Sequence, residues 1–501
     1  MTVFNRCEAH RIGSGFHPDP SVCVTPEGRY LLVNSSFEFF PGLPMFDSPD
    51  GYHWSRIPDA VSRPGQFVYD RMGNSQGMYA PTIRYGDGRY YLIVTNVNKG
   101  TMMMTSDDPV RGWSDPLWID GWPGIDPSLF FDDDGSVYIC GNESASPDPG
   151  QPAEPAGIYM ARIDVGTGRI TSPRRRICAG VTGANPEGPH MYKRRGVYYL
   201  MWAEGGTESG HMENIARASD PYGPYDMYPG NPLITNRSTH LTLQGIGHCD
   251  MAGCEADRTL MVFHGFRCND EYPAQAWIGR ESYSTWFRWR DGWPDLSDQS
   301  FDCPLKGDGE SGEREVHWMT PGIDRLHLHE VLEAPDGTSI RVKAVEQDFG
   351  IEETVPFIGT RQTGFFCRFG VRCPRVADLR RGEAGIVVYA NQRHYVTFAF
   401  HRSPQRATRL LCHAYNEGLV SRVASVSLDD ALPLRLMVRA DSRGYSFAFG
   451  QGSGALVDIG RVPGKLLGFS SAGGFTGTML GVYAHGAGEV VFRDVDYSCA
   501  G

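Results

Sequence analysis

The amino-acid sequence predicts an all-β fold in which a five-bladed β-propeller is followed by a β-sandwich. Two features of the composition favour short strands joined by turns: 61 glycines and 34 prolines among 501 residues, and 12% aromatic residues. The third observation is an internal repeat in the first three hundred residues, which has a period typical of propeller blades. The length by itself favours two or three domains.

Each of the five units of the repeat places a polar turn before a short run rich in Tyr, Leu, Val and Ile. The turns begin at Gly28, Gly88, Gly135, Gly196 and Asp257. Successive turns are therefore separated by 60, 47, 61 and 61 residues. Trp54 and Trp113 follow the first two units, and we expect both rings to pack between blades.

The position nine residues before each turn holds a chemically versatile side chain in all five units. These residues are Asp19, Tyr79, Asp126, Glu187 and His248. Because equivalent positions on the innermost strands of a propeller surround one axis, we expect the five side chains to converge. Three carboxylates held together raise at least one pKa, as an acid catalyst requires. The alternative, polar residues that bond only to nearby backbone, does not explain acids at three of five positions.

Paired carboxyl groups of unequal protonation are the machinery of glycosidic bond cleavage. One protonated acid donates to the leaving oxygen, and one ionised carboxylate activates water or attacks the anomeric carbon. Prolines on both sides stiffen the backbone of Asp19, and the longer Glu187 suits a donor that reaches across a pocket. Asp126 would keep the Glu187 proton in place. The candidates for aromatic walls of the cleft are Phe37, Phe39 and Tyr79.

Charge and cysteine content restrict the partners and the location. The net charge of −12 argues against a nucleic acid or an anionic membrane as partner. The sequence has no apolar run of ~18 residues that would predict a transmembrane helix, and residues 1–15 do not resemble a secretory signal, which favours the cytoplasm. Twelve scattered cysteines without a CxxC pair predict reduced, mostly buried thiols and no zinc site. The oligomeric state, including a homo-oligomer, stays open.

Seven motifs occur in one order along the chain and resemble those of glycoside hydrolase family 43. They read FHPDPS from Phe16, SSFEFFPG from Ser35, YAPT from Tyr79, IDPSLF from Ile125, PEGPH from Pro186, GH from Gly247 and IGRE from Ile278. The resemblance extends over almost the whole chain. It implies a five-bladed propeller with the activity of an inverting β-xylosidase, α-L-arabinofuranosidase or arabinanase.

The resemblance also implies a role for each matching residue. Asp19 corresponds to the family's general base, Glu187 to its general acid and Asp126 to its pKa modulator. Arg280 resembles the arginine that binds hydroxyls of the terminal sugar, with a simple surface ion pair as the alternative. His248 is similar to the axial histidine, with a purely structural role as the alternative. No cofactor is required, although a divalent cation such as calcium, or a water, can lie near His248.

One departure from the family pattern affects the pocket wall. Many members have Trp-Ala-Pro-Asp where this chain has Tyr79-Ala-Pro-Thr82. The smaller, hydroxylated ring and the missing carboxylate leave the choice between xylose and arabinofuranose open.

The second part of the chain reads as a sandwich. From about Pro294 to Val316 the sequence turns polar, and residues 306–315 within it predict a linker or surface crossing. It would separate a propeller over residues 1–305 from a sandwich over residues 316–501. Alternating segments separated by turn signals follow it. Segments from Arg361 and Gly473 resemble the concanavalin-like jelly-roll domain of the family's exo-enzymes. There a loop aromatic closes the pocket over the terminal sugar; Phe475 is the matching residue, and ordinary sandwich core is the alternative.

These observations predict an inverting exo-glycosidase that acts on oligosaccharides. It would release terminal β-D-xylose, α-L-arabinofuranose or both from xylo-oligosaccharides or arabinoxylan. The alternatives are an arabinan-degrading endo or exo enzyme and a non-catalytic carbohydrate-binding propeller. The appended domain counts against an endo enzyme, which needs an open groove, and the presence of all three carboxylates counts against a binding module.

Overall fold

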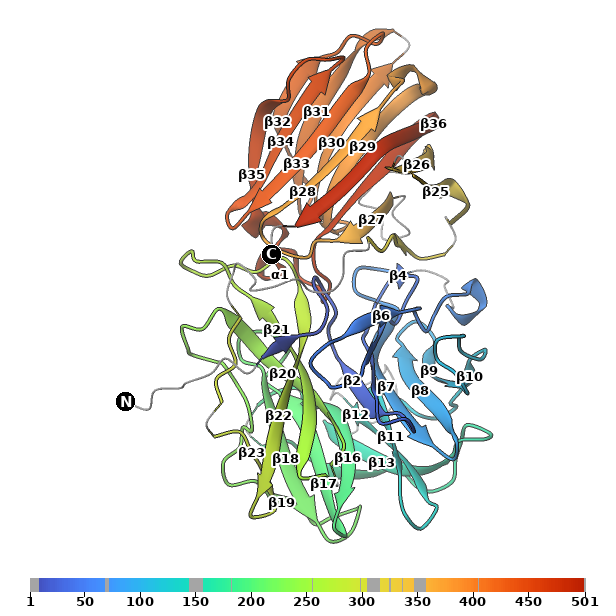
Figure 1. Ribbon diagram of the computed structural model, residues 1–501, viewed down its shortest axis with the longest axis vertical. Helices are drawn as coiled ribbons and strands as arrows, with labels where there is room; N and C mark the ends of the chain where they lie inside the picture. Colours follow the sequence, from blue (N-terminus) through green and yellow to red (C-terminus); the bar gives the residue numbers. More distant parts are fainter. Residues whose placement is uncertain are drawn as a thin grey trace.

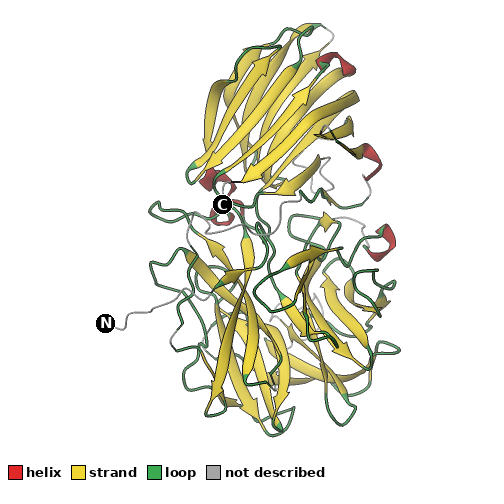
Figure 2. Ribbon diagram, in the orientation of Figure 1, coloured by secondary structure: helices red, strands yellow, loops and turns green. Residues whose placement is uncertain are grey.

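The computed structural model describes residues 9–67, 72–143, 156–181, 183–254, 256–297, 299–303, 316–323, 326–335, 337–346, 357–403 and 405–499. They form a propeller and a sandwich that lie end to end (Figure 1). Figure 2 shows that helix is confined to short turns. These are η1 (Pro64–Gln66), η2 (Leu326–Leu328), η3 (Val376–Asp378), η4 (Gly464–Leu467) and α1 (Phe469–Ala472). None of the described helices is long and apolar enough to cross a membrane. The predicted linker, residues 306–315, lies outside the described residues.

The first four blades of the propeller are antiparallel sheets whose strands follow one another along the chain. Blade one contains β2 (Ser21–Val24), β3 (Tyr30–Val33), β5 (Met45–Ser48) and β6 (Ser55–Ile57). Blade two contains β7 (Met78–Gly86), β8 (Arg89–Asn96), β9 (Gly100–Ser106) and β10 (Leu117–Trp118). Blade three contains β11 (Ile125–Phe131), β12 (Val137–Glu143), β13 (Gly157–Asp164), β14 (Arg169–Ile170) and β15 (Arg175–Cys178). Blade four contains β16 (Glu187–Arg194), β17 (Val197–Glu204), β18 (Met212–Ala218) and β19 (Asp226–Met227).

The fifth blade joins the two ends of the propeller. It contains β20 (Leu243–Ala252), β21 (Arg258–Arg267), β22 (Arg280–Arg290), β23 (Trp293–Asp295) and the N-terminal strand β1 (His10–Arg11). β1 pairs antiparallel with β22 and so closes the ring. The innermost strands β2, β7, β11, β16 and β20 each contact the next, and β20 contacts β2. The repeat in the sequence therefore corresponds to five blades, as predicted.

Apolar side chains from neighbouring blades hold the ring together. Trp54 of blade one is buried with Leu260 and Val262 of blade five. Trp113 of blade two is buried in a cluster that includes Leu31 of blade one. Removing apolar surface from water contributes roughly 25 cal/mol per Å², so these contacts fix the blades around the axis. The prediction that both tryptophans pack between blades is confirmed.

The C-terminal body is a sandwich formed by one folded twelve-stranded sheet. Its strands are β25 (His329–Ala334), β26 (Gly337–Lys343), β27 (Phe357–Arg361), β28 (Cys367–Cys373), β29 (Leu379–Asn391), β30 (His394–Ser403), β31 (Arg406–Asn416), β32 (Leu419–Ser427), β33 (Leu434–Asp441), β34 (Gly444–Gln451), β35 (Val457–Pro463) and β36 (Met479–Cys499). The long strand β36 pairs with β29 through its first half and with β28 through its second half. Phe369, Phe398 and Phe447 pack between the layers. The predicted sandwich is confirmed.

Strands and side chains join the two bodies directly. β24 (Thr320–Pro321) pairs with β4 (Phe39–Phe40) of the propeller. Phe16 and Phe39 are buried in one apolar cluster with Tyr389 and Tyr483 of the sandwich. The prediction that Phe39 lines the cleft is wrong, because this ring is fully enclosed between the two bodies.

Candidate active site

The five equivalent side chains lie at the end of the propeller that faces the sandwich. Glu187 begins β16 and Asp126 lies at the start of β11, while Asp19 immediately precedes β2. Tyr79 and His248 belong to β7 and β20. The strand register shifts beside the site residue in β7, β11, β16 and β20. Such bulges redirect side chains. Here they lie next to the side chains that converge on the axis, as the repeat predicted.

Three of these residues have a left-handed backbone. Asp19, Asp126 and His248 have φ values of 55°, 53° and 52°, and Gly188, which follows Glu187, has a φ of 58°. For residues other than glycine this conformation is uncommon and costs on the order of 1–3 kcal/mol each. The rest of the fold therefore holds these side chains in place against local strain.

Asp19 is an ionised carboxylate in a dense set of donors and is only 5% exposed. Its Oδ1 accepts a hydrogen bond from Arg280 Nη1 at 2.6 Å, and its Oδ2 accepts one from Ser35 Oγ at 2.6 Å. The main-chain N–H of Asp19 donates to His264 Nδ1 at 3.1 Å. Burial alone would raise the pKa of Asp19, but Arg280 and His264 outweigh it and hold that pKa well below its usual value.

Glu187 and Asp126 are shifted in the opposite direction. Burial, followed by the negative charges of Asp126 and Asp19, raises the pKa of Glu187 to about 8. Burial also raises the pKa of Asp126. His248 lowers this pKa and the negative charge of Asp19 raises it, and the net shift is upward. Asp126 Oδ2 accepts a hydrogen bond from the main-chain N–H of Gly188 at 3.0 Å, which ties it to the residue after Glu187. At neutral pH the site thus holds an ionised Asp19 and a protonated Glu187.

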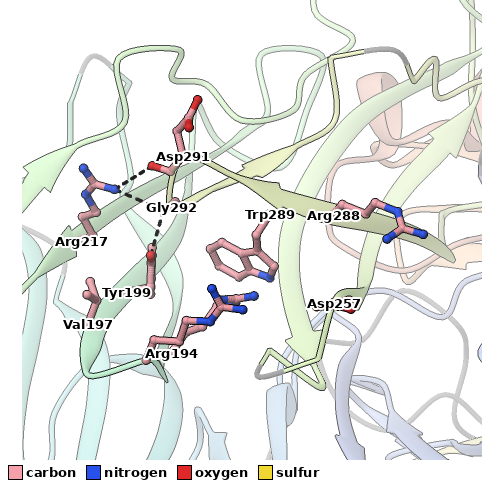
Figure 3. Close-up of a pocket in the computed structure, with 10 residues that line it drawn as sticks. Arg194, Val197, Tyr199, Arg217, Asp257, Arg288, Trp289, Asp291 and Gly292 are labelled. Carbon is pink, nitrogen blue, oxygen red and sulfur yellow. Dashed lines mark hydrogen bonds between the residues drawn. The ribbon is translucent and has the colours of Figure 1, made fainter.

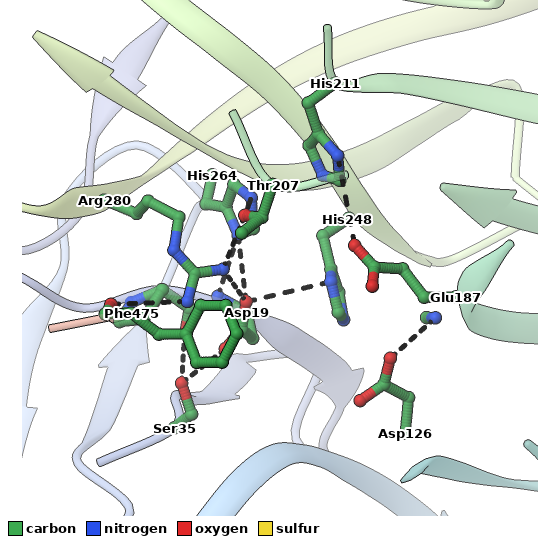
Figure 4. Close-up of polar contacts among 12 residues, drawn as sticks. Asp19, Ser35, Asp126, Glu187, Thr207, His211, His248, His264, Arg280 and Phe475 are labelled. Atoms are coloured by element: carbon green, nitrogen blue, oxygen red, sulfur yellow. Dashed lines mark hydrogen bonds and ion pairs between the residues drawn. The ribbon is translucent and has the colours of Figure 1, made fainter. Parts of the chain in front are cut away.

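Three histidines lie beside Asp19 and Glu187, and His248 is the one between them (Figure 4). His248 Nδ1 lies 3.7 Å from Asp19 Oδ1, and His211 Nδ1 lies 4.0 Å from Glu187 Oε1. The His211 and His264 rings are stacked with centroids 5.1 Å apart. Burial lowers the pKa of His264 to about 3 and that of His211 well below its usual value, so both rings are neutral. His248 is buried beside Asp19 and His264.

Arg280 connects Asp19 to the sandwich. Its Nη1 also donates to Thr207 Oγ1 at 2.9 Å, and its Nη2 donates to the Phe475 carbonyl at 3.4 Å. The guanidinium lies 5.9 Å from the Phe37 ring centroid and 5.7 Å from that of Phe475. Arg280 is buried, so the alternative of a simple surface ion pair is wrong.

An aromatic wall formed by both bodies borders the site. The Phe37 and Phe475 rings are stacked with centroids 5.7 Å apart, and each meets Tyr79 edge-on, at 5.4 Å and 5.8 Å. The main-chain N–H of Phe475 donates to Ser75 Oγ of the propeller at 2.7 Å. Because Phe475 is 36% exposed, the alternative that it belongs to the sandwich core is wrong.

Both residues that depart from the family motif reach the site. Burial and the Asp126 charge raise the pKa of Tyr79 to about 12, so its phenol stays protonated. Thr82 lines a small cavity beneath the carboxylates together with Asp19, Asp126 and His248. The two positions that differ from the family motif therefore border the carboxyl groups of the site.

Among the residues that the structure describes, two sets of side chains have the spacing to hold a metal ion: Asp19 with His248 and His264, and Glu187 with His211 and His248. Calcium takes about six to eight oxygen ligands, whereas each set offers two imidazoles and one carboxylate. In addition, Asp19 Oδ1, the oxygen near His248, already accepts a hydrogen bond from Arg280. These donors do not fit a directly bound calcium ion, and the water near His248 stays a prediction.

Sequence reasoning missed four members of the site, which are Ser35, Thr207, His211 and His264. His264 is paired with Gly247 across β20 and β21, and Thr207 follows the end of β17. Strand register and loop shape place them there, and neither follows from the repeat. A correct alignment of β20 with β21 would have paired His264 with Gly247, the neighbour of His248 in the chain. That pairing is the one signal that could have placed His264 in the site.

A five-bladed propeller with an ionised and a protonated carboxyl at one end of its axis has the fold and site of a glycoside hydrolase. The chain matches the family described as "Glycosyl hydrolases family 43" over residues 10–294. It matches the "Beta xylosidase C-terminal Concanavalin A-like domain" over residues 310–498. The chain therefore belongs to glycoside hydrolase family 43, as the motifs predicted.

Individual relatives agree with this assignment. The chain is similar to the non-reducing end alpha-L-arabinofuranosidase of Bacteroides ovatus, with 30% identity over 97% of this chain and 92% of that protein. A xylosidase/arabinosidase of Butyrivibrio fibrisolvens is 36% identical over 56% of this chain and 54% of its own length. The crystal structure of xylan beta-1,4-xylosidase from Bacillus halodurans has a TM-score of 0.86 at 25% identity, covering 98% of this chain and all of that one.

Proposed function

We propose that this glycosidase is an inverting exo-enzyme that releases terminal β-D-xylose or α-L-arabinofuranose from xylo-oligosaccharides or arabinoxylan. The observation that carries the proposal is the opposite pKa shift of Asp19 and Glu187 within one site. Hydrolysis with inversion requires one ionised base and one protonated acid at the same pH. The xylosidase and arabinofuranosidase relatives support a pentose as the sugar that is released.

In this mechanism Asp19 accepts a proton from water as the water oxygen attacks the anomeric carbon. Glu187 donates its proton to the glycosidic oxygen while the bond from that oxygen to the anomeric carbon breaks. The sugar leaves with inverted configuration, and solvent then restores the two protonation states. Asp126 acts through Glu187: its charge favours the protonated acid, and its bond to the Gly188 N–H fixes the strand at that point.

The groups around the acids support binding of a terminal sugar. Arg280 holds Asp19 through Nη1, while its Nη2 lies towards the aromatic wall, where it would bind sugar hydroxyls. His248 and Tyr79 would contact the same sugar ring. The Phe475 loop comes from the sandwich and meets Phe37 across the site. A wall at that place supports attack at chain ends or side branches and counts against an endo-acting arabinanase.

Nitrophenyl β-D-xyloside and nitrophenyl α-L-arabinofuranoside test the substrate assignment. We expect hydrolysis of one or both, with the ratio of kcat/KM values giving the sugar preference. Proton NMR of the first product should show the inverted anomer. Hydrolysis of neither glycoside would remove the exo-pentosidase proposal, and a retained anomer would remove the inverting mechanism.

Substitution of the two acids tests their roles. Asp19→Asn and Glu187→Gln should each lower kcat on the order of 10²- to 10⁴-fold, the range typical of general acid–base loss. Glu143→Gln is a matched control for Glu187→Gln, because the two side chains are 19% and 18% exposed and Glu143 pairs with Arg174 away from the site. Near-normal kcat in either active-site variant would contradict the roles.

A location in the cytoplasm and the oligomeric state stay predictions from the sequence. Nine of the described cysteines are buried, as the sequence predicted for most of them.

A further inference from the structure

A second cavity lies at the opposite end of the propeller, between blades four and five (Figure 3). Its volume is about 520 Å³, within the range of sites for small molecules. The end of β16 and the end of β22 form its walls. Since β16 runs from Glu187 to Arg194, the cavity is roughly 23 Å from the catalytic acid at the ~3.3 Å rise of a strand. Nothing in the proposed reaction uses it.

Arg194 is the central observation in this cavity. The residue is only 7% exposed, yet no carboxylate pairs with it in the part of the chain that the structure describes. Its Nε also has no hydrogen-bond partner there. The guanidinium lies over the Trp289 ring, 5.0 Å from the centroid. A buried cation without a counter-charge is costly, so the protein keeps here a positive charge that an incoming anion can pair with.

The other lining residues extend this positive character. Four arginines and two aspartates line the cavity, although the whole chain has a net charge of −12. Arg217 Nη1 donates hydrogen bonds to the main-chain carbonyls of Asp291 at 3.2 Å and Gly292 at 3.4 Å. Arg288 is exposed at the mouth of the cavity. Arg194, Arg217 and Arg288 therefore bring guanidinium groups to the same space.

We infer that this cavity binds the carboxylate of an acidic sugar, such as a uronic acid unit of an oligosaccharide. Guanidinium groups match a carboxylate in shape and charge and bind it with paired hydrogen bonds. The Asp257 carboxylate, which lines the cavity, would accept hydrogen bonds from hydroxyls, which a sugar supplies in number. The same carboxylate repels a phosphate dianion more strongly than a singly charged sugar.

Calorimetric titration of the full chain tests the inference with three probes: glucuronic acid, glucose and inorganic phosphate. Glucose carries a neutral CH2OH group where glucuronic acid carries the carboxylate and is otherwise identical. We expect saturable binding of glucuronic acid, with glucose and phosphate each binding at least ~10-fold more weakly, since a hydrogen-bonded charge pair contributes about that much. Absence of glucuronic acid binding, equal binding of glucose, or tighter binding of phosphate would each overturn the assignment.

Variants then locate the binding. Arg288→Met, at an exposed position that leaves folding intact, and Arg194→Met should each weaken glucuronic acid binding ~10-fold or more. Arg111→Met is the control, because that arginine is exposed and pairs with Asp108 on blade two. Unchanged affinity in both Arg288→Met and Arg194→Met would overturn the site. Hydrolysis of nitrophenyl pentosides should stay unchanged in all three variants, so a failure here is distinct from a failure of the proposed function.

Discussion

At the scale of single residues, the backbone conformation explains how one structural position supplies different chemistry in different blades. Asp19, Asp126 and His248 share the left-handed conformation, which short polar side chains tolerate better than bulky or branched ones. Glu187 reaches the same region differently, with Gly188 taking the positive φ after it. The spacing of nine residues before each turn predicted the position. The conformation itself follows from the strand bulges, which the sequence pattern does not reveal.

The pH dependence of kcat/KM should follow the two opposite pKa shifts. Asp19 must be ionised and has a lowered pKa, so activity should persist well below pH 5 before it falls. Glu187 must be protonated, so activity should fall as the pH rises through about 8. Asp126→Asn removes a charge that raises the Glu187 pKa and should move the alkaline limb to lower pH. An alkaline limb that stays in place in this variant would contradict the role of Asp126.

The raised pKa of Glu187 also predicts a stability effect. The folded protein keeps this proton up to about pH 8, whereas a carboxyl in the unfolded chain releases it near 4.5. The Glu187 contribution to folding is therefore complete below pH 4.5 and is lost as the pH rises through 8. The glutamine side chain of Glu187→Gln cannot ionise. The Tm of this variant minus the Tm of the wild type should therefore increase from pH 5 to pH 9. Thermal melts measure this difference, and a Tm difference that stays constant from pH 5 to pH 9 would contradict the raised pKa of Glu187.

At the scale of elements, the loop that carries Phe475 is the sandwich's contribution to the site. The ring contacts Phe37 and Tyr79, and the Ser75 hydroxyl holds the loop backbone. Phe475→Ala should lower kcat/KM for nitrophenyl pentosides ~10-fold, mainly by raising KM, because an aromatic contact with the sugar is lost. Its Tm should change little, since the ring is partly exposed. Tyr272→Ala, which removes a fully exposed ring, is the control, and an unchanged KM in Phe475→Ala would contradict the binding role.

The elements also show what the sequence could predict and what it could not. Turns and apolar runs located the strands of every blade because their spacing repeats. Phe39 was assigned to the cleft with Phe37 and Tyr79, as one of three candidate aromatic walls. Phe37 instead has a left-handed backbone, with a φ of 52°, and Phe39 turns into the cluster beneath the sandwich. Local sequence does not reveal a surface that a distant domain covers.

At the scale of the whole molecule, the two bodies share one core. Phe16 and Phe39 of the propeller pack with Tyr389 and Tyr483, and the Arg361 Nε donates to the Phe16 carbonyl at 2.8 Å. The full chain should therefore unfold in a single calorimetric transition. Residues 1–305 produced alone should melt at a lower temperature and lose activity, because the shared cluster and the Phe475 loop are missing. Two separate transitions in the full chain, with a fully active fragment, would contradict this coupling.

The bond between Asp19 and Arg280 joins residues 261 positions apart, across the point where β1 completes the last blade. On the ribosome, Asp19 is therefore synthesised 261 residues before Arg280, whose guanidinium holds it ionised. Contacts of such high sequence separation form late in folding. A nascent chain has no working active site until the whole circle of blades has been translated, so hydrolysis begins only once the ring is complete.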